Sequence, residues 1–128
     1  MSKELTATYK RAEIRHTLTC LSDVDYQQAC WIERRCPPGR EHDRLRLHLG
    51  FLLNDNDFTE DPKAEIGVSV YSEEEALAIQ KVAQWLYIIV ANDGHYAKDE
   101  VHLHSEEWHH VVSTSKAALN LMNKHESD

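Results

Sequence analysis

The chain has 128 residues, 41% of them hydrophobic and 28% charged, which is typical of one globular domain. We therefore expect a single domain over residues 1–128, with a frayed tail from about residue 123. The formal net charge is −8 at pH 7, and an acidic surface repels phosphate backbones, which argues against a direct nucleic-acid partner. No apolar stretch is long enough to span a membrane, and the N-terminus lacks the apolar core of a signal peptide, so we expect a cytoplasmic protein.

The first two predicted elements are helices. Apolar residues recur at helical spacing between residues 3 and 21, which indicates an amphipathic helix. A second helix is predicted to follow Ser22 and to end before Pro37, since proline cannot continue a helix. The odd number of cysteines, three, and the lack of CxxC or zinc-ribbon spacing predict free thiols at Cys20, Cys30 and Cys36.

Two strands are predicted next. Leucine and phenylalanine alternate with mainly polar residues over residues 45–53, which is the pattern of a strand with one buried face. Residues 54–62 form a polar loop of turn formers, and residues 66–71 alternate again as a second, antiparallel strand.

A capped helix follows the predicted strands. Ser72 and Glu75 form a capping box, and the helix from Ser72 to about Ala91 is apolar nearly all round, which indicates a central core helix. Residues 101–103 are a possible short third strand, and a final helix after Ser105 carries Trp108 and Met122 on one face. The predicted fold is therefore α+β, in the order α-α-β-β-α-(β)-α, with a small antiparallel β-sheet packed against about four helices.

The negative charge is concentrated in two parts of the chain, of which residues 93–107 hold five acidic residues against Lys98. Residues 54–75 hold eight acidic residues against Lys63 alone. Such a cluster can attract and orient a basic protein, although its acids could equally serve only to keep the domain soluble. The candidate partner-binding residues are these acids with two aromatic anchors: Asp55, Asp57, Phe58, Glu60, Asp61, Tyr71, Glu73 and Glu74.

The sequence contains no recognisable catalytic motif. It has no GxSxG, no P-loop, no GxGxxG and no HExxH, so we expect no enzyme, no catalytic residue, no cofactor and no metal. One alternative is a metal-dependent enzyme, because the chain has nine histidines, and His102 and His104 could bind zinc with a third from His95, His109 or His110. Another is a regulatory or scaffold subunit that dimerises through the apolar face of the last helix.

Several segments together resemble a known group of small bacterial proteins, over about residues 12–122. The segments are Leu21-Ser-Asp-Val-Asp-Tyr-Gln, Trp31-Ile-Glu-Arg-Arg, Pro38-Gly39, Asp43, Asp61-Pro62 and Glu107-Trp108. In these the chain is similar to immunity proteins of contact-dependent growth inhibition systems. The resemblance implies one-to-one binding of a cognate basic toxin domain, the C-terminal part of a large secreted protein, and its neutralisation in the cytosol. It also implies that the toxin is a ribonuclease that cleaves transfer RNA, and it supplies no catalytic residues.

Overall fold

The computed structural model describes residues 4–56, 58–94 and 96–126, which are helices joined by turns and loops. Three helices are long: α1 (Thr8–Ser22), α4 (Glu73–Asp93) and α6 (Trp108–Glu126). The short elements are α2 (Val24–Tyr26), η1 (Gln27–Ile32), α3 (Leu45–Leu49), η2 (Gly50–Asp55), η3 (Pro62–Glu65) and α5 (Asp99–Leu103).

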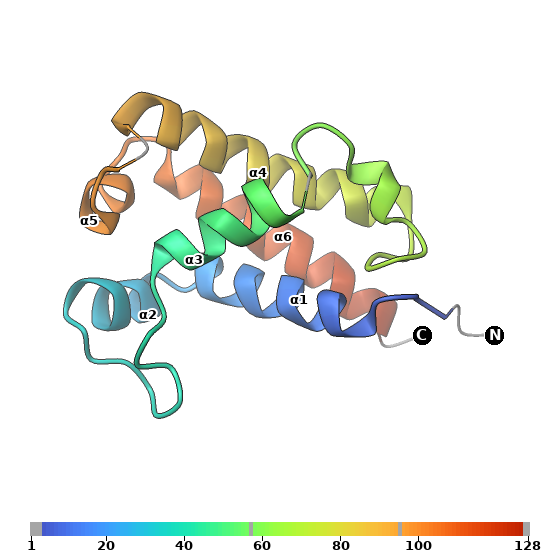
Figure 1. Cartoon of the computed structure of the whole chain (residues 1–128), viewed down its shortest axis with the longest axis horizontal. Helices are drawn as coiled ribbons and strands as arrows, with labels where there is room; N and C mark the ends of the chain where they lie inside the picture. The colour runs from blue at the N-terminus through green and yellow to red at the C-terminus, as the bar shows by residue number, and fades with distance from the viewer. Residues whose placement is uncertain (1–3, 57, 95, 127–128) are drawn as a thin grey trace.

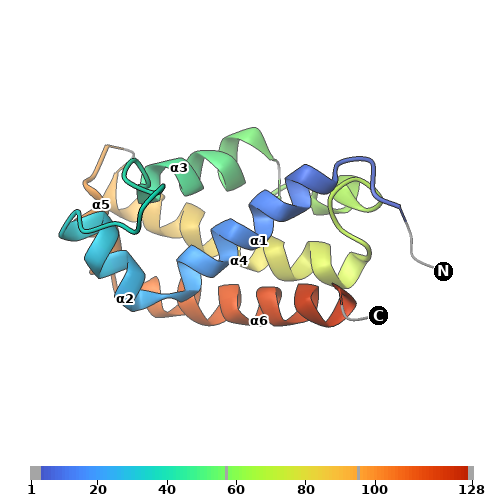
Figure 2. The same cartoon turned by 90° about the horizontal axis from the view of Figure 1, so that it is seen from below.

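The long helices form the body of the domain. α6 packs against both α1 and α4, and α3 with η2 lies on the opposite side of these two helices from α6 (Figures 1 and 2). α2 and α5 lie at one end of the body, and η3 lies at the other end with the first turn of α4 (Figure 1). Trp108, Val111, Ala118 and Met122 of α6 are buried in this core, so most of the face that the dimer alternative requires is covered within the chain.

The prediction of an α+β fold is wrong, because no strand occurs among the described residues. The predicted strand at residues 45–53 is helical and continues from α3 into the wider turns of η2. Leu45, His48 and Leu52 are buried while Leu47 is 56% exposed, which is the three-and-four spacing of a helical face. The stretch also contains no β-branched residue, so intrinsic preference favours a helix over a strand.

The two other predicted strands are also absent. After η3 the chain turns sharply, and the carbonyl of Glu65 accepts the N–H groups of Val68, Ser69 and Val70 at 3.0, 3.0 and 3.1 Å. The segment forms an isolated bridge between Ile66 and Val70, and the carbonyls of Gly67 and Val68 accept the N–H groups of Thr6 and Ala7 at 3.1 and 2.9 Å. Its expected partner strand is a helix. Residues 101–103 belong to α5.

Local helix signals were more reliable than the strand pattern. α4 begins as predicted, because the Ser72 hydroxyl accepts the N–H of Glu75 at 3.2 Å. The helix ends at Gly94, whose φ of +101° is a conformation that other residues rarely adopt. The cap of α2 is Asp23, which accepts the N–H of Tyr26 at 3.0 Å, one residue after the predicted Ser22.

Two cysteines form a disulfide, so the expectation of three free thiols is wrong. The chain reverses after η1 and brings Cys36 back to Cys30, with a Cα–Cα distance of 4.2 Å. Cys20 on α1 is the free thiol, and it is buried.

A buried ion pair joins the three long helices near the start of α1. Arg11 donates to both carboxylate oxygens of Glu75, at 2.8 and 2.9 Å, and both side chains are buried. The same carboxylate accepts the N–H of Tyr71 at 2.8 Å and is bonded to His125 Nδ1 at 2.6 Å. Arg11 also pairs with Glu126 on α6. The contact therefore connects α1, α4 and α6 through one carboxylate.

This carboxylate makes the stability of the fold sensitive to acid. Burial opposes the charged form of Glu75, but the hydrogen bonds from Arg11, Tyr71 and His125 outweigh it, so its pKa is lower than usual. The stabilisation is complete above the unfolded pKa of about 4.3 and is lost as the pH falls toward the folded value. We expect urea midpoints to decrease from about pH 5 to about pH 3, with a shallower decrease in Glu75→Gln. Equal slopes in the two proteins would contradict this assignment.

Candidate functional site

The two acidic segments lie together at one end of the domain. η3 packs against the first turns of α4, and Lys63 pairs with Glu73 at 3.2 Å. The loop before η3 is tied to α4 as well, because Gln80 donates to the carbonyl of Thr59 at 3.0 Å. Figure 1 shows η3 and the start of α4 at the same end. We call the exposed carboxylates of these segments the acidic end: Glu60, Asp61, Glu73 and Glu74, together with Asp55, which lies farther along α4 at the end of η2 (Figure 1).

Two of the predicted binding residues do not contribute to this surface. Phe58 is fully buried in the core, so it anchors the loop to its own domain and is not available to a partner. Tyr71 is half-buried, with the Arg11 guanidinium 4.3 Å from its ring centroid. Asp57 lies outside the described residues.

Two further acids of the cluster are used inside the protein. Glu75 is buried against Arg11, and Glu65 accepts from Lys10 at 2.9 Å. Neither carboxylate adds free negative charge to the surface. Among the described residues of these segments, the acidic end therefore has five exposed carboxylates against Lys63, and two of the acids counted in the sequence are paired internally.

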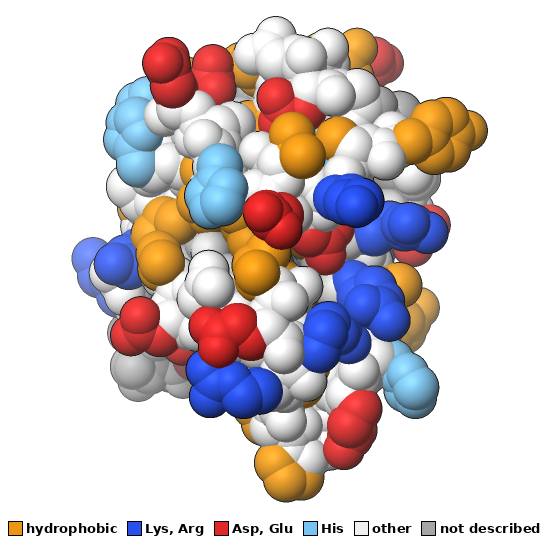
Figure 3. All heavy atoms as spheres, turned by 90° about the vertical axis from the view of Figure 1, so that its left-hand side faces the viewer, with side chains coloured by type: hydrophobic (Ala, Val, Ile, Leu, Met, Phe, Trp, Pro, Cys, Tyr) orange, Lys and Arg blue, Asp and Glu red, His pale blue; other side chains and the backbone are white. Residues whose placement is uncertain are grey.

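The opposite end of the molecule has a different surface. Figure 3 views the side on which α2 and α5 lie in Figure 1, and it shows acidic and basic side chains intermixed with exposed hydrophobic ones. A mixed surface of this kind produces little net field.

The histidines chosen from the sequence do not form a metal cluster among the described residues. His102 is buried and bonds to Asp93 at 3.1 Å, whereas His104 is exposed. His110 stacks on Trp85 with ring centroids 4.0 Å apart, and His109 is bonded to the carbonyl of Glu106. His95 lies outside the described residues.

A different group of polar side chains converges between α1 and α3. Asp43, just before α3, accepts from Trp31 Nε1 at 2.9 Å and from the hydroxyl of Tyr26 at 2.5 Å, and its other oxygen bonds to His48 Nε2 at 2.8 Å. The second nitrogen of His48 bonds to the Thr17 hydroxyl on α1 at 2.9 Å. Burial opposes ionisation of Asp43, but the three donors outweigh it and hold its pKa far below the usual range.

His16 and Cys20 lie beside His48 on the neighbouring face of α1. His16 Nε2 is 3.7 Å from Cys20 Sγ, and one atom from each of the three side chains lies within 4.8 Å of the others. Burial and the Asp43 carboxylate raise the pKa of Cys20 to about 11, so the free thiol is neutral at pH 7 and is not an activated nucleophile. Burial and the Arg40 guanidinium lower the pKa of His16.

Sequence reasoning did not single out this group. The four-residue spacing of His16 and Cys20 in a predicted helix indicated that these two side chains share a face. His48 was assigned to a strand, which gave no reason to place it beside α1.

Comparison with known proteins identifies the family of the chain but no individual relative. The family described as "Domain of unknown function (DUF7945)" matches residues 7–128, so the chain belongs to it. No curated protein and no solved structure matches the chain. None of the described helices combines the length and the apolar character needed to cross a bilayer.

Proposed function

We propose that this member of the DUF7945 family is a binding protein whose acidic end docks onto a basic partner protein. From the sequence resemblance, we infer that the partner is the C-terminal toxin domain of a contact-dependent growth inhibition system, a ribonuclease that cleaves transfer RNA. The protein would then act as an immunity protein, binding the toxin one-to-one in the cytosol and covering its basic substrate groove.

The observation that carries the proposal is the convergence of the two acidic segments. Asp55, Glu60 and Asp61 come from one segment and Glu73 and Glu74 from the other, and packing of η3 on α4 brings the segments together. Clustered charge of one sign steers a partner of opposite sign and accelerates association. A basic groove that binds RNA phosphates presents the complementary charge.

Tight binding also needs apolar contacts, because charges at the rim of an interface mainly set the association rate. Phe58 and Tyr71 do not supply an exposed anchor, but Ile66 and Leu77 are 39% and 37% exposed. Leu77 follows Glu73 by four residues and therefore lies on the same face of α4. Ile66 directly follows η3. We expect these two side chains, in place of the aromatic residues, to make the apolar contacts with the partner.

The experiment that tests the function is co-expression with the C-terminal domain of the protein encoded directly upstream. We expect the chain to restore growth of cells that produce this domain and to elute with it as a one-to-one complex in gel filtration. Failure of both rescue and complex formation would refute the immunity role.

Charge reversal tests the surface. Replacing Asp55, Glu60 and Asp61 with lysine should slow association with the toxin domain by about tenfold or more at low salt, because the steering field is reversed. The association rate can be measured by stopped-flow fluorescence at low and high salt, after circular dichroism confirms the fold.

The matched control reverses three exposed acids near the opposite end: Asp25, Glu100 and Glu106. It changes net charge by the same amount, so a general charge effect would slow both variants equally. We expect the control to associate at close to the wild-type rate. Equal rates for the two variants would show that the acidic end is not the docking surface.

A further inference from the structure

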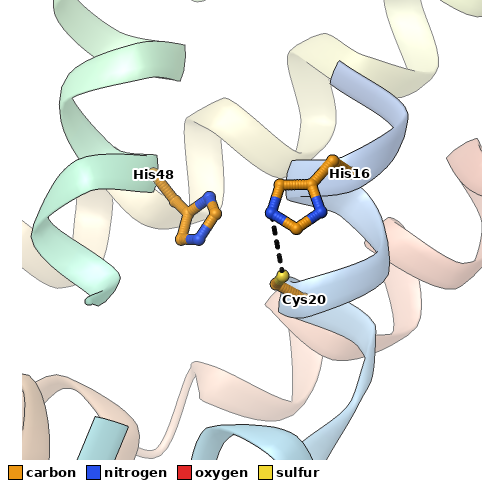
Figure 4. A group of neighbouring side chains, drawn as sticks. All are labelled: His16, Cys20 and His48. Carbon is orange, nitrogen blue, oxygen red and sulfur yellow. Dashed lines mark hydrogen bonds between the residues drawn. The ribbon is translucent and has the colours of Figure 1, made fainter. Parts of the chain in front are cut away.

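The group formed by His16, Cys20 and His48 has the donor types and spacing of a zinc site. Thiolate and imidazole are the usual protein ligands of zinc. Zinc–nitrogen and zinc–sulfur bonds of about 2.0 and 2.3 Å at a tetrahedral angle place the two donor atoms about 3.5 Å apart. The 3.7 Å between His16 Nε2 and Cys20 Sγ is close to this value. Figure 4 shows these two side chains on one helix, with His48 reaching toward them from another.

The surroundings of His48 orient its ring for such a role. Asp43 bonds to Nε2, and in the tautomer with its proton on that nitrogen, the lone pair of Nδ1 points toward α1, where the Thr17 hydroxyl donates to it. A carboxylate that holds the outer nitrogen of a ligand histidine is a common feature of zinc sites. Asp43 is itself held by Tyr26 and Trp31, so the orientation does not depend on the metal.

We propose that His16 Nε2, Cys20 Sγ and His48 Nδ1 bind one zinc ion, with Asp43 as the residue that positions His48. The cysteine binds as thiolate and releases its proton to solvent, and the Thr17 hydrogen bond to His48 is exchanged for the metal bond. Three protein ligands leave the fourth tetrahedral position for water. A shallow surface pocket adjoins the site at His16 and is also lined by Gly39, Arg40, His42, Asp43 and Leu47. This site is separate from the acidic end and does not depend on the proposed function.

Arg40 opposes metal binding in the geometry of the free protein. Its Nη1 lies 2.9 and 3.0 Å from the two nitrogens of His16 and 3.8 Å from Cys20 Sγ. The residue is exposed on the loop before α3, so it can move away when a cation binds. Removing it should strengthen zinc binding, because a positive charge beside the ligands is lost.

Cobalt substitution tests the site with a signal that only a thiolate ligand gives. The full chain is stripped of metal by a chelator and titrated with Co²⁺ and with Zn²⁺. We expect one metal per chain, a near-ultraviolet thiolate-to-cobalt absorption band, and loss of that band when zinc displaces cobalt. Absence of the band in the wild-type protein would overturn the proposal whatever the variants do.

Variants then assign the ligands. Cys20→Ser should abolish the band, and His16→Gln and His48→Gln should each weaken zinc binding by about tenfold or more. Arg40→Ala should bind zinc severalfold more tightly. His102→Gln is the matched control, because His102 is also a buried histidine bonded to a carboxylate but lies outside the group. A loss of affinity in His102→Gln equal to that in His48→Gln, or weaker binding in Arg40→Ala, would refute the assignment.

Discussion

Replacing Glu75 with glutamine is expected to lower the free energy of unfolding by about 3–5 kcal/mol, the usual cost of leaving a buried charge without its partner. Arg11 would keep its positive charge in a buried position and lose two charged hydrogen bonds. Glu126 can offset little of this, because its side chain is 36% exposed and solvent screens the pair. The change is measured by urea unfolding at neutral pH.

Two comparisons separate the ion pair from a general effect of the substitution. Glu74→Gln makes the same chemical change one residue earlier on an exposed side chain, so it should alter stability by no more than about 0.5 kcal/mol. The double variant Arg11→Met with Glu75→Leu removes both charges and should be more stable than Glu75→Gln alone. A double variant as unstable as the single one would show that the pair is not the source of the loss.

The acids illustrate what the sequence could and could not predict. Ser72 caps α4 as predicted, and that helix was predicted nearly to the residue. The Glu75 side chain, predicted to complete a capping box, instead accepts the N–H of Tyr71 and pairs with Arg11. Its partner Arg11 is 64 residues away, and no local pattern reveals a contact of that range. The sequence therefore counted Glu65 and Glu75 among the cluster's charges, although internal pairing removes both from the surface charge.

The failed strand has a different physical origin. Residues 45–53 alternate in polarity, but the same letters also place Leu45, His48 and Leu52 on one face of a helix. The leucines and phenylalanine at 49, 51 and 53 fit the two-residue period of a strand, but in the structure they lie half-buried at the edge of the helical face. The alternation in polarity therefore did not distinguish a strand from this helix. This one error also hid the zinc ligands, since His48 reaches His16 and Cys20 only when its segment is helical and packed near α1.

Phe58 was predicted to bind the partner, and its burial can be tested directly. It was predicted as an exposed anchor because it is the one aromatic residue in an acidic loop, yet its side chain is fully buried. Truncating a buried phenylalanine leaves a cavity, so Phe58→Ala should lower the free energy of unfolding by about 3–5 kcal/mol. Phe58→Leu keeps most of the volume and should cost much less.

The two roles of Phe58 predict opposite results, so stability and binding should be measured together. As a core residue it holds the loop between η2 and η3 against the body, and its truncation should speed hydrogen exchange in that loop as well as lowering stability. The acidic end would then lose its fixed geometry, and binding would weaken as a consequence. A surface anchor would instead leave stability within about 0.5 kcal/mol of wild type and affect binding alone. That result would contradict the burial of Phe58 in the core and would support its predicted role as a partner-binding residue.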